Sequence, residues 1–364
     1  MPAYLTDSST TIREDLMDRI AIISPNDTPL FHLLEKQSAH NTLFDWSMDN
    51  IDSESLSPTS GDFARVEGVD ATYPTLAARQ RASNYNHIVT RAVQVSDTER
   101  QVLEAGVDDE FSYQIYKKFL EVLKQADFAC HFSEYQSLAE GSQPSKTHGL
   151  ANWLYACGDI AGNGLNVAAT IAAHTITTST FRSTLFDGAN ANLTRDQLHD
   201  SMLQPAHVGG MDLSGAVALV PSQMKRIISQ FAFVYDGGST TDTVVPLNER
   251  RIGARERTLI DTIDVFETDF GTIYMNIDRR MNDTSASAVL GTSVPESYIV
   301  TQASAPDNLM LIIDPTMFRI RVLEGLTFIP LAKTGHSTKG MVVIDFGFQC
   351  DNPKAGILGV DVHT

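Results

Sequence analysis

The side chains of this chain that could hold a metal are three cysteines and ten histidines. A structural zinc site needs four closely placed Cys or His ligands, and the sequence has no Cys-x-x-Cys pair. Cys130 and His131 are neighbours in a predicted helix, so their side chains point in different directions. His199 and His207 are too far apart for one helical turn. This spacing favours structural or exposed histidines over a metal site.

Motifs for nucleotide binding and catalysis are weak. A phosphate-binding loop needs Gly-x-x-x-x-Gly-Lys-Ser/Thr, and the chain has no such string. Asp269-Phe270-Gly271 matches the metal-binding triplet of protein kinases, but the other kinase motifs are missing, so a hairpin turn is favoured. A Ser/His/Asp triad could still assemble from distant residues, and an enzyme with an unrecognised site stays open. We expect no catalytic residue, no cofactor and no metal.

Composition points to a globular protein that does not grip nucleic acid. Hydrophobic residues make up 42% of the 364 residues and the formal net charge is −18. Phosphate contacts need Lys and Arg, so an acidic chain is expected to be a poor sequence-independent DNA binder, and any dealings with nucleic acid would be containment instead of tight binding. Three cysteines do not make a disulfide framework and are typical of a reducing compartment. The chain shows no secretory signal and no apolar run long enough for a membrane span.

Residues 1–37 are predicted to form an arm with little core of its own. Thr11 and Glu14 have capping-box spacing, which predicts a helix start. Apolar residues then follow at helical spacing, and the prolines of Ser24–Pro29 end that helix. The apolar residues expected to dock on another surface are Ile12, Leu16, Ile20, Leu30 and Phe31.

Residues 38–96 are predicted to form a long β-hairpin, of which residues 38–95 make up an extended loop. Phe44, Trp46 and Met48 alternate with polar residues, which indicates a strand with one apolar face. The returning strand is expected from Tyr85 to Val95, with a polar, mobile tip between Ile51 and Gly68. A two-stranded ribbon is marginal in water, so it needs a surface to lie on.

The hairpin region carries arginine without lysine. Arg79, Arg81 and Arg91 lie in a stretch with no Lys between Lys36 and Lys117. These arginines either form two-pronged bonds with carboxylates of a neighbouring molecule or are ordinary solvated charges.

The rest of the chain is mixed α+β. The longest helix is predicted over residues 108–133, which corresponds to roughly 39 Å. Residues 134–190 are expected to be irregular loops, because they are rich in Gly, Ser, Thr and Asn. Further elements are predicted as helices beginning at Thr194, Ser222 and Pro315, strands at 216–220 and 309–313, a hairpin over 258–281, and a closing strand with Val342, Ile344, Phe346 and Phe348 on one face.

Five strings in order resemble the major capsid proteins of tailed bacteriophages, whose shell fold is shared with encapsulins. The arm motif is Ile23-Ser24-Pro25-Asn26-Asp27-Thr28-Pro29-Leu30, and Phe44-Asp45-Trp46 is similar to the start of the extended loop. The later markers are Glu267-Thr268-Asp269-Phe270-Gly271, Leu331-Ala332-Lys333-Thr334-Gly335 and Asn352-Pro353-Lys354-Ala355. The resemblance covers residues 12 to 357.

The resemblance implies a self-assembling subunit and not an enzyme. Its implied parts are an N-terminal arm (1–37), an extended loop (38–95), a peripheral domain with a spine helix (96–189 and 336–364; helix 108–133) and an axial domain (190–335). Hexamers and pentamers would form an icosahedral shell around double-stranded DNA, assembled in the host cytoplasm, with weak DNA contacts and a portal as partner. The arm and loop residues above would make the assembly contacts, together with Tyr85 and the three arginines.

Two departures from relatives refine this expectation. The arm begins close to Met1, so any scaffolding protein is expected to be a separate chain. Some relatives link subunits through a lysine of the extended loop, and this loop has no lysine, so we expect a shell held non-covalently. The alternative is an encapsulin-like nanocompartment, which would enclose enzymes instead of a genome.

Overall fold

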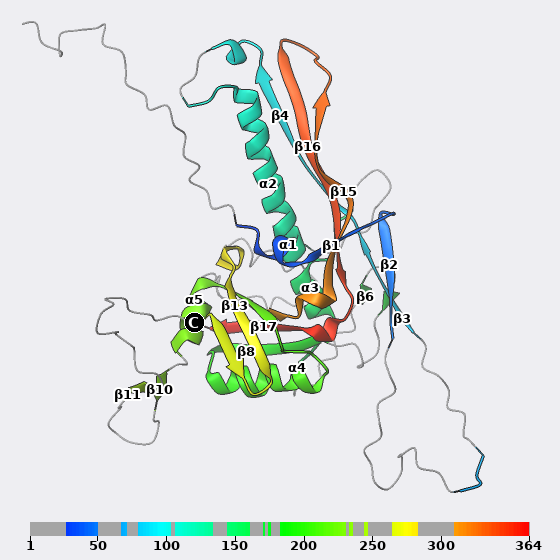
Figure 1. The fold of residues 1–364 in the computed structure, drawn as a ribbon, viewed down its shortest axis with the longest axis vertical. Coiled ribbons are helices and arrows are strands. Elements are labelled where there is room, and N and C mark those ends of the chain that lie inside the picture. The colour runs from blue at the N-terminus through cyan, green and yellow to red at the C-terminus, as the bar shows by residue number, and fades with distance from the viewer. Residues whose placement is uncertain are drawn as a thin grey trace, which may run out of the picture. The chain divides into compact units, whose positions relative to one another are not determined.

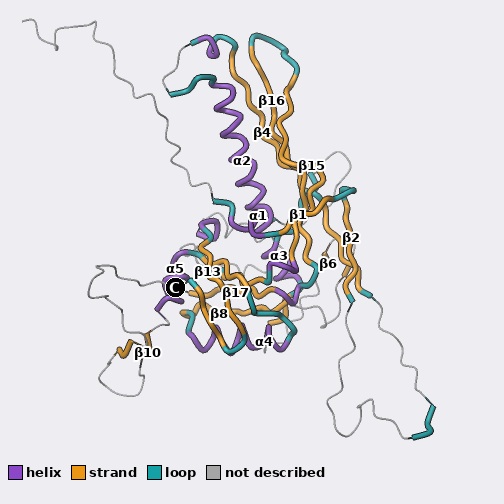
Figure 2. The backbone as a smooth tube through the Cα atoms, viewed as in Figure 1, coloured by secondary structure: helices purple, strands orange, loops and turns teal. Residues whose placement is uncertain are grey.

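The computed structural model describes residues 27–49, 67–70, 79–102, 106–133, 144–160, 170–171, 174–175, 183–230, 233–235, 244–246, 264–282 and 309–363. The predicted arm helix after Thr11 and most of the predicted hairpin tip lie outside these residues. The chain divides into two compact units. Unit 1 comprises Met1–Asp27, Val89–Gln125 and Glu324–Ile344, and unit 2 comprises Thr28–Ile88, Ala126–Leu323 and Asp345–Thr364. Helices and strands mix in both, as the α+β prediction requires (Figures 1 and 2).

Unit 1 pairs a helix with long strands. It contains most of α2 (Glu110–Phe132) and of β4 (His87–Ser96), and parts of β15 (Phe318–Leu331) and β16 (Ser337–Cys350). The strands belong to a sheet of order β1-β15-β16-β4, with β1 at Glu35–Ser38. Within unit 1, the helix runs beside these strands (Figure 1), and the ring of Phe111 meets that of Phe328 edge-on at 6.1 Å. The spine helix predicted over 108–133 is confirmed to within two residues.

The strand predictions for the segment before α2 hold in part. Val89, Val93 and Val95 are buried on β4, as their spacing predicted. Before the helix starts, Ser96 Oγ accepts a hydrogen bond from Glu99 N at 3.1 Å and opens a three-residue 3₁₀ turn, Glu99–Gln101. The single hairpin expected over 38–96 is wrong, because β2 (Leu43–Met48) pairs with β3 (Gln80–Tyr85) while β4 joins β16 in another sheet.

Unit 2 is built on a seven-stranded sheet of order β12-β13-β9-β14-β17-β8-β5. The strands are β5 (Gly158–Ile160), β8 (Ser183–Asn192), β9 (Ala216–Val220), β12 (Val265–Thr268), β13 (Gly271–Ile277), β14 (Met310–Ile313) and β17 (Gly356–His363). Its helices are α1 (Pro29–Leu33), α3 (Leu150–Ala156), a π-helical turn at Gln197–Leu203, α4 (Gln204–Val208) and α5 (Ser222–Gln230). Short 3₁₀ turns lie at Arg279–Asn282, Pro315–Met317 and Pro353–Ala355. Two small pairs complete the described strands: β6 (Thr170–Ile171) with β7 (His174–Thr175), and β10 (Phe233–Tyr235) with β11 (Val244–Pro246).

The core of unit 2 lies between this sheet and its helices. Met202, Leu203, Met224 and Ile228 of the helices pack with strand residues such as Ile312, all with no exposed surface. A reciprocal capping box starts the first of these helices, because Thr194 Oγ1 accepts from Gln197 N and Thr194 N donates to Gln197 Oε1. The strand at 216–220 and the helix from Ser222 are confirmed.

Asp269-Phe270-Gly271 forms the predicted hairpin turn between β12 and β13. Thr268 Oγ1 accepts hydrogen bonds from the backbone N of Phe270 and of Gly271. Gly271 has φ +153°, and a Cβ there would lie 2.6 Å from the backbone of Leu213, so glycine is required for this close approach. The triplet therefore has a local structural explanation.

Three predictions were wrong or incomplete. Residues 134–190 are not wholly irregular, because α3, β5 and most of β8 lie there. The helix expected from Pro315 is a single 3₁₀ turn, after which β15 runs for 14 residues. The closing strand is β16, where Val342, Ile344, Phe346 and Phe348 are buried as predicted, but a further strand, β17, follows it. No helix in the described ranges is both long and apolar enough to span a membrane.

Candidate assembly surfaces

Strands β2 and β3 form an antiparallel ribbon in unit 2. Leu43 lies opposite Tyr85 at one end of the pairing and Met48 opposite Gln80 at the other. Two ion pairs cross the ribbon: Arg79 Nε lies 2.9 Å from Asp49 Oδ2, and Arg81 pairs with Asp45. Both arginines are more than half exposed, so these pairs leave guanidinium surface free for solvent or a neighbour.

The root of the ribbon is held by aromatic packing. The Phe44 ring stacks on Trp46 at 5.9 Å, and Trp46 meets Trp153 of α3 at 5.5 Å. Phe44 also lies against β16, where a Cβ added to Gly347 would be 2.4 Å from its ring. Glycine at position 347 therefore makes room for the aromatic side chain that joins the ribbon to the body of unit 2.

A buried amide fixes the same region by hydrogen bonds. Asn84 of β3 has no exposed surface, and its Nδ2 donates to Thr147 Oγ1 at 3.1 Å, to the carbonyl of His148 at 3.2 Å and to the carbonyl of Phe348 at 2.6 Å. Its Oδ1 accepts from the backbone N of His148 and of Tyr85, both at 2.9 Å. Thr147 Oγ1 also accepts from Phe348 N at 2.9 Å. We call Asn84, Thr147, His148 and Phe348 the Asn84 network.

The segment after Asp27 docks on its own chain in unit 2. Leu30, Phe31 and Leu34 are buried, and the Phe31 ring meets Phe346 edge-on at 6.1 Å. β1 then pairs in parallel with β15, from Glu35 opposite Arg319 to Ser38 opposite Val322. The base of the predicted arm is therefore part of the subunit body.

A buried charged cluster contacts this segment. His131 Nε2 is 2.6 Å from Asp278 Oδ2, and His131 Nδ1 is 2.8 Å from the carbonyl oxygen of Asp127. Asp127 Oδ1 accepts a hydrogen bond from Phe31 N at 2.9 Å. Burial alone would lower the pKa of His131, but the carboxylates of Asp278 and Asp127 outweigh it and hold that pKa above its ordinary value. The two carboxylates thus favour the protonated imidazole, and the cluster ties α1 to the end of α2 that lies in unit 2.

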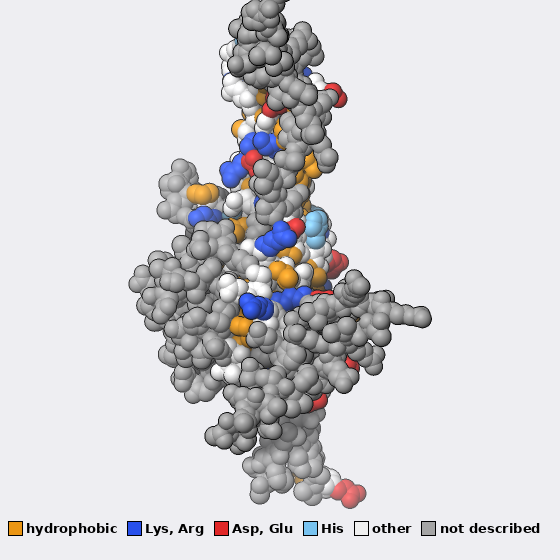
Figure 3. All heavy atoms as spheres, turned by 90° about the vertical axis from the view of Figure 1, so that its left-hand side faces the viewer, with side chains coloured by type: hydrophobic (Ala, Val, Ile, Leu, Met, Phe, Trp, Pro, Cys, Tyr) orange, Lys and Arg blue, Asp and Glu red, His pale blue; other side chains and the backbone are white. Residues whose placement is uncertain are grey.

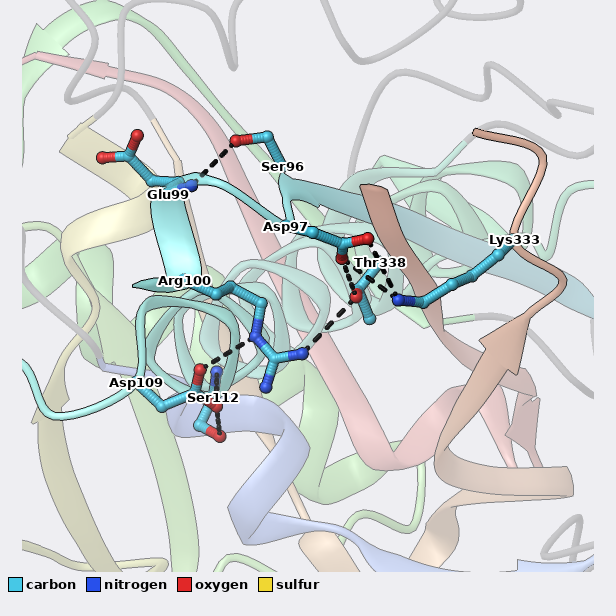
Figure 4. A network of polar contacts seen from close by, with 8 residues as sticks. All are labelled: Ser96, Asp97, Glu99, Arg100, Asp109, Ser112, Lys333 and Thr338. Carbon is cyan, nitrogen blue, oxygen red and sulfur yellow. Dashed lines mark hydrogen bonds and ion pairs between the residues drawn. The ribbon is translucent and has the colours of Figure 1, made fainter. Parts of the chain in front are cut away.

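Unit 1 carries a polar network around Asp97 (Figure 4). Lys333 Nζ lies 3.1 Å from Asp97 Oδ1, and Thr338 Oγ1 donates to the same atom at 2.9 Å. Arg100 reaches both Asp109, at 3.2 Å, and Thr338. Hydrogen bonds from Lys333 and then Thr338 lower the pKa of Asp97. This network joins the end of β4 to the start of α2 and to the β15–β16 connection.

Charges are mixed on the one face of the described residues that Figure 3 shows. On the face shown in Figure 3, Lys and Arg side chains are spread among apolar and acidic ones and do not gather into one patch. Among the described residues no group of three or more His, Cys, Asp or Glu side chains is arranged to hold a metal ion.

The predicted assembly residues fall into four groups by their burial in the structure. Ile12, Leu16 and Ile20 lie outside the described residues. The side chains of Leu30, Phe31, Phe44 and Met48 are at most 6% exposed, so they have little surface to offer a neighbour, whereas Trp46 and Tyr85 are half-buried. Arg79, Arg81 and Arg91 are exposed, and Arg91 lies 4.0 Å from Glu121. Their contacts with another subunit stay a prediction.

Sequence reasoning missed the Asn84 network and the role of His131. The partners of Asn84 in the network, Thr147, His148 and Phe348, lie 63 to 264 residues away along the chain, so no local pattern marks them. In the sequence His131 stands out only as the neighbour of Cys130, and its partner Asp278 is on a distant turn.

Comparison with known proteins gives concordant results. The family model described as SU10 major capsid protein matches residues 3–362. A curated relative, the major capsid protein of Escherichia phage Phieco32, is 32% identical over 108 residues; this alignment covers 30% of the present chain and only 29% of that relative.

Solved structures resemble the chain over almost its full length. The capsid asymmetric unit of cyanophage A-1(L) has a TM-score of 0.66 at 14% identity and covers 99% of this chain and 100% of that one. The capsid of a native GTA particle has a TM-score of 0.57 at 10% identity, with 99% and 98% covered. The mature capsid of bacteriophage PhiM1 has a TM-score of 0.54 at 10% identity, with 95% and 90% covered. The chain thus has the fold of phage capsid subunits and belongs to the SU10 major capsid protein family, whose members are structural proteins of the virion shell and not enzymes.

Proposed function

We propose that copies of this chain form hexamers and pentamers, and that these build an icosahedral shell around double-stranded DNA. The family match over residues 3–362 carries the proposal, because it spans the arm, the extended loop and both units. The proposed site of assembly is the host cytoplasm, with a separate scaffolding protein and a portal as partners.

The proposed subunit has an arm at 1–37, an extended loop at 38–95, a peripheral domain at 96–189 and 336–364, and an axial domain at 190–335. The seven-stranded sheet favours an adjustment of these boundaries. β8 and β17 pair with one another, and β17 pairs with β14, so residues 183–192 and 356–363 go with the axial domain. The spine helix remains the long element of the peripheral domain.

Contacts between subunits are proposed to use the exposed ribbon. Its two arginines retain exposed guanidinium groups, and such groups form two-pronged bonds to carboxylates of a neighbour. Each standard-size contact between proteins buries roughly 1,200–2,000 Å², and several weak contacts per subunit add up to a stable shell.

Packaged DNA is proposed to meet this shell weakly and without sequence preference. The net charge of −18 opposes tight binding of phosphates. Salt screens the remaining repulsion over about 10 Å at 0.1 M. The DNA would then slide freely during packing and release.

Electron microscopy of the purified wild-type chain tests the proposal. We expect closed, hollow particles of uniform diameter in negative stain when the protein concentration is raised. A chain that remains monomeric at every concentration, with and without a molecular crowder, would reject a shell-forming role. Denaturing electrophoresis of the particles should give one band at 39.9 kDa, and a ladder of multimers would contradict non-covalent assembly.

A further inference from the structure

We propose that the Asn84 network fixes the direction in which the β2–β3 ribbon projects from the rest of unit 2, so that Asn84 and Thr147 are positioning residues for assembly. Only the expected effect on shell assembly rests on the proposed function. The ribbon direction itself is a property of the single subunit.

Asn84 lies where the ribbon ends. It is the last residue but one of β3, which stops at Tyr85, and β4 begins at His87 in a different sheet. Its register partner on β2 is Phe44. The chain therefore changes from one sheet to another within three residues of this amide.

The network joins three segments that are far apart in sequence. The amide of Asn84 binds the 147–148 segment, which precedes α3, and the Phe348 carbonyl of β16. Thr147 Oγ1 closes the connection by accepting from Phe348 N at 2.9 Å. Asn84 and Thr147 have no exposed surface and His148 only 7%, so water does not readily replace these bonds.

Hydrogen bonds add a directional constraint to the neighbouring aromatic contacts. Phe44, Trp46 and Trp153 hold the ribbon root by ring packing, which has preferred arrangements over a wide range of centroid distances, whereas hydrogen bonds weaken steeply when they are bent. The amide has donors and acceptors in a fixed plane, and four of its contacts reach other segments, through the two N–H groups of Nδ2 and through Oδ1, so they constrain rotation of β3. Loss of the network should leave the ribbon attached but differently oriented.

A small rotation at the root becomes large at the far end. The described ribbon is six residues long in each strand, or roughly 20 Å, and a rotation of about 15° at its root would move the far end by about 5 Å. A shell that repeats this contact at every subunit would accumulate such an error.

The test measures ribbon direction in the monomer and shell formation in parallel. Spin labels are placed on Ser47→Cys, on the exposed side of the ribbon, and on Val208→Cys at the end of α4, where the side chain is 80% exposed. The native cysteines are buried and serve as the unlabelled control. Thr147→Val removes the hydroxyl at nearly constant shape, Thr147→Ser is the matched control that keeps it, and Asn84→Asp removes the donors of the amide.

We expect one narrow distance distribution in the wild type and in Thr147→Ser. In Thr147→Val and Asn84→Asp the distribution should broaden or shift by about 5 Å, with the circular dichroism of the folded protein retained. The yield of closed shells should fall about tenfold for the same two variants. Their buried donors and acceptors lose partners, so the ribbon is no longer held in the direction that assembly requires.

Wild-type distance distributions in both variants would overturn the inference while leaving the proposed function intact. Loss of folding in both would also overturn it, because the network would then hold the subunit together instead of orienting the ribbon. Failure of the wild-type chain to form shells would reject the proposed function, and the distance measurement would still decide the ribbon direction.

Discussion

His131 Nε2 lies 2.6 Å from Asp278 Oδ2, and both side chains are fully buried in unit 2. Asp278 and Asp127 raise the pKa of His131 although burial opposes this. The folded state therefore binds a proton more tightly than the unfolded chain does. This pairing is fully formed below pH 6.5, and its contribution is lost as the pH rises through the folded-state pKa.

Replacing His131 should destabilise the subunit and should remove the loss of stability that is expected as the pH rises through the folded-state pKa of His131. We expect His131→Leu to lower the free energy of unfolding by about 3–5 kcal/mol near pH 6, because breaking a buried pair strands a charge. Urea unfolding followed from about pH 6 to about pH 10 measures both effects. The double variant His131→Leu/Asp278→Asn should recover part of the loss, and a His131→Leu protein as stable as wild type would contradict the assignment.

His148 should act with the opposite sign. Burial lowers its pKa to about 4, so the folded state excludes a proton that the unfolded chain binds. Stability should therefore fall as the pH drops below 6.5 and level off below about 4, for a loss of about 3 kcal/mol. His148→Gln should flatten the unfolding free energy over this acidic range, and an unchanged slope would assign the acid sensitivity to other groups, such as His87, whose pKa is also lowered to about 4.

Gly347→Ala should disturb the ribbon root by overpacking. The new methyl group would lie 2.4 Å from the Phe44 ring, which is buried and cannot move freely. We expect a destabilisation of about 1–3 kcal/mol in thermal unfolding. Gly325→Ala on β15 is the control, because a methyl group added there would meet no atom within 4 Å.

A second-site change should identify the clash. The substitution Phe44→Leu replaces the ring with a smaller side chain. In the double variant it is expected to offset part of the destabilisation caused by Gly347→Ala. Strict additivity of the two single effects would show that the glycine matters for another reason.

Arg79 and Arg81 should affect assembly more than folding. Their ion pairs with Asp49 and Asp45 are largely exposed, and such pairs contribute about 0–1 kcal/mol each. We expect Arg79→Gln/Arg81→Gln to unfold within about 1 kcal/mol of the wild type and to raise the protein concentration needed for shell formation. Replacing both arginines with Lys keeps the positive charge but removes the two-pronged hydrogen bonding. A Lys variant that assembles poorly would show that the two-pronged bond is needed, and one that assembles normally would show that charge attraction is enough. If the Gln variant assembled like the wild type, both arginines would be ordinary solvated charges that assembly does not need.

The sequence by itself determined the local elements and the family resemblance. Spacing predicted α2 almost to its ends, the apolar face of β2 that buries Phe44 and Met48, and the helix start at Thr194, because each depends on residues a few positions apart. The turn at Asp269-Phe270-Gly271 followed from the same local rules. Such patterns need no knowledge of the rest of the chain.

Only the tertiary structure decided which strands pair and which polar groups meet. Sequence alternation gives the buried face of β4 but not its partner, so it could not separate β4 from the ribbon of β2 and β3. β17 was missed although it lies inside the seven-stranded sheet, next to β14 and β8. The bonds of Asn84 to Phe348 and of His131 to Asp278 join residues more than a hundred positions apart, and burial supplies their strength by excluding water.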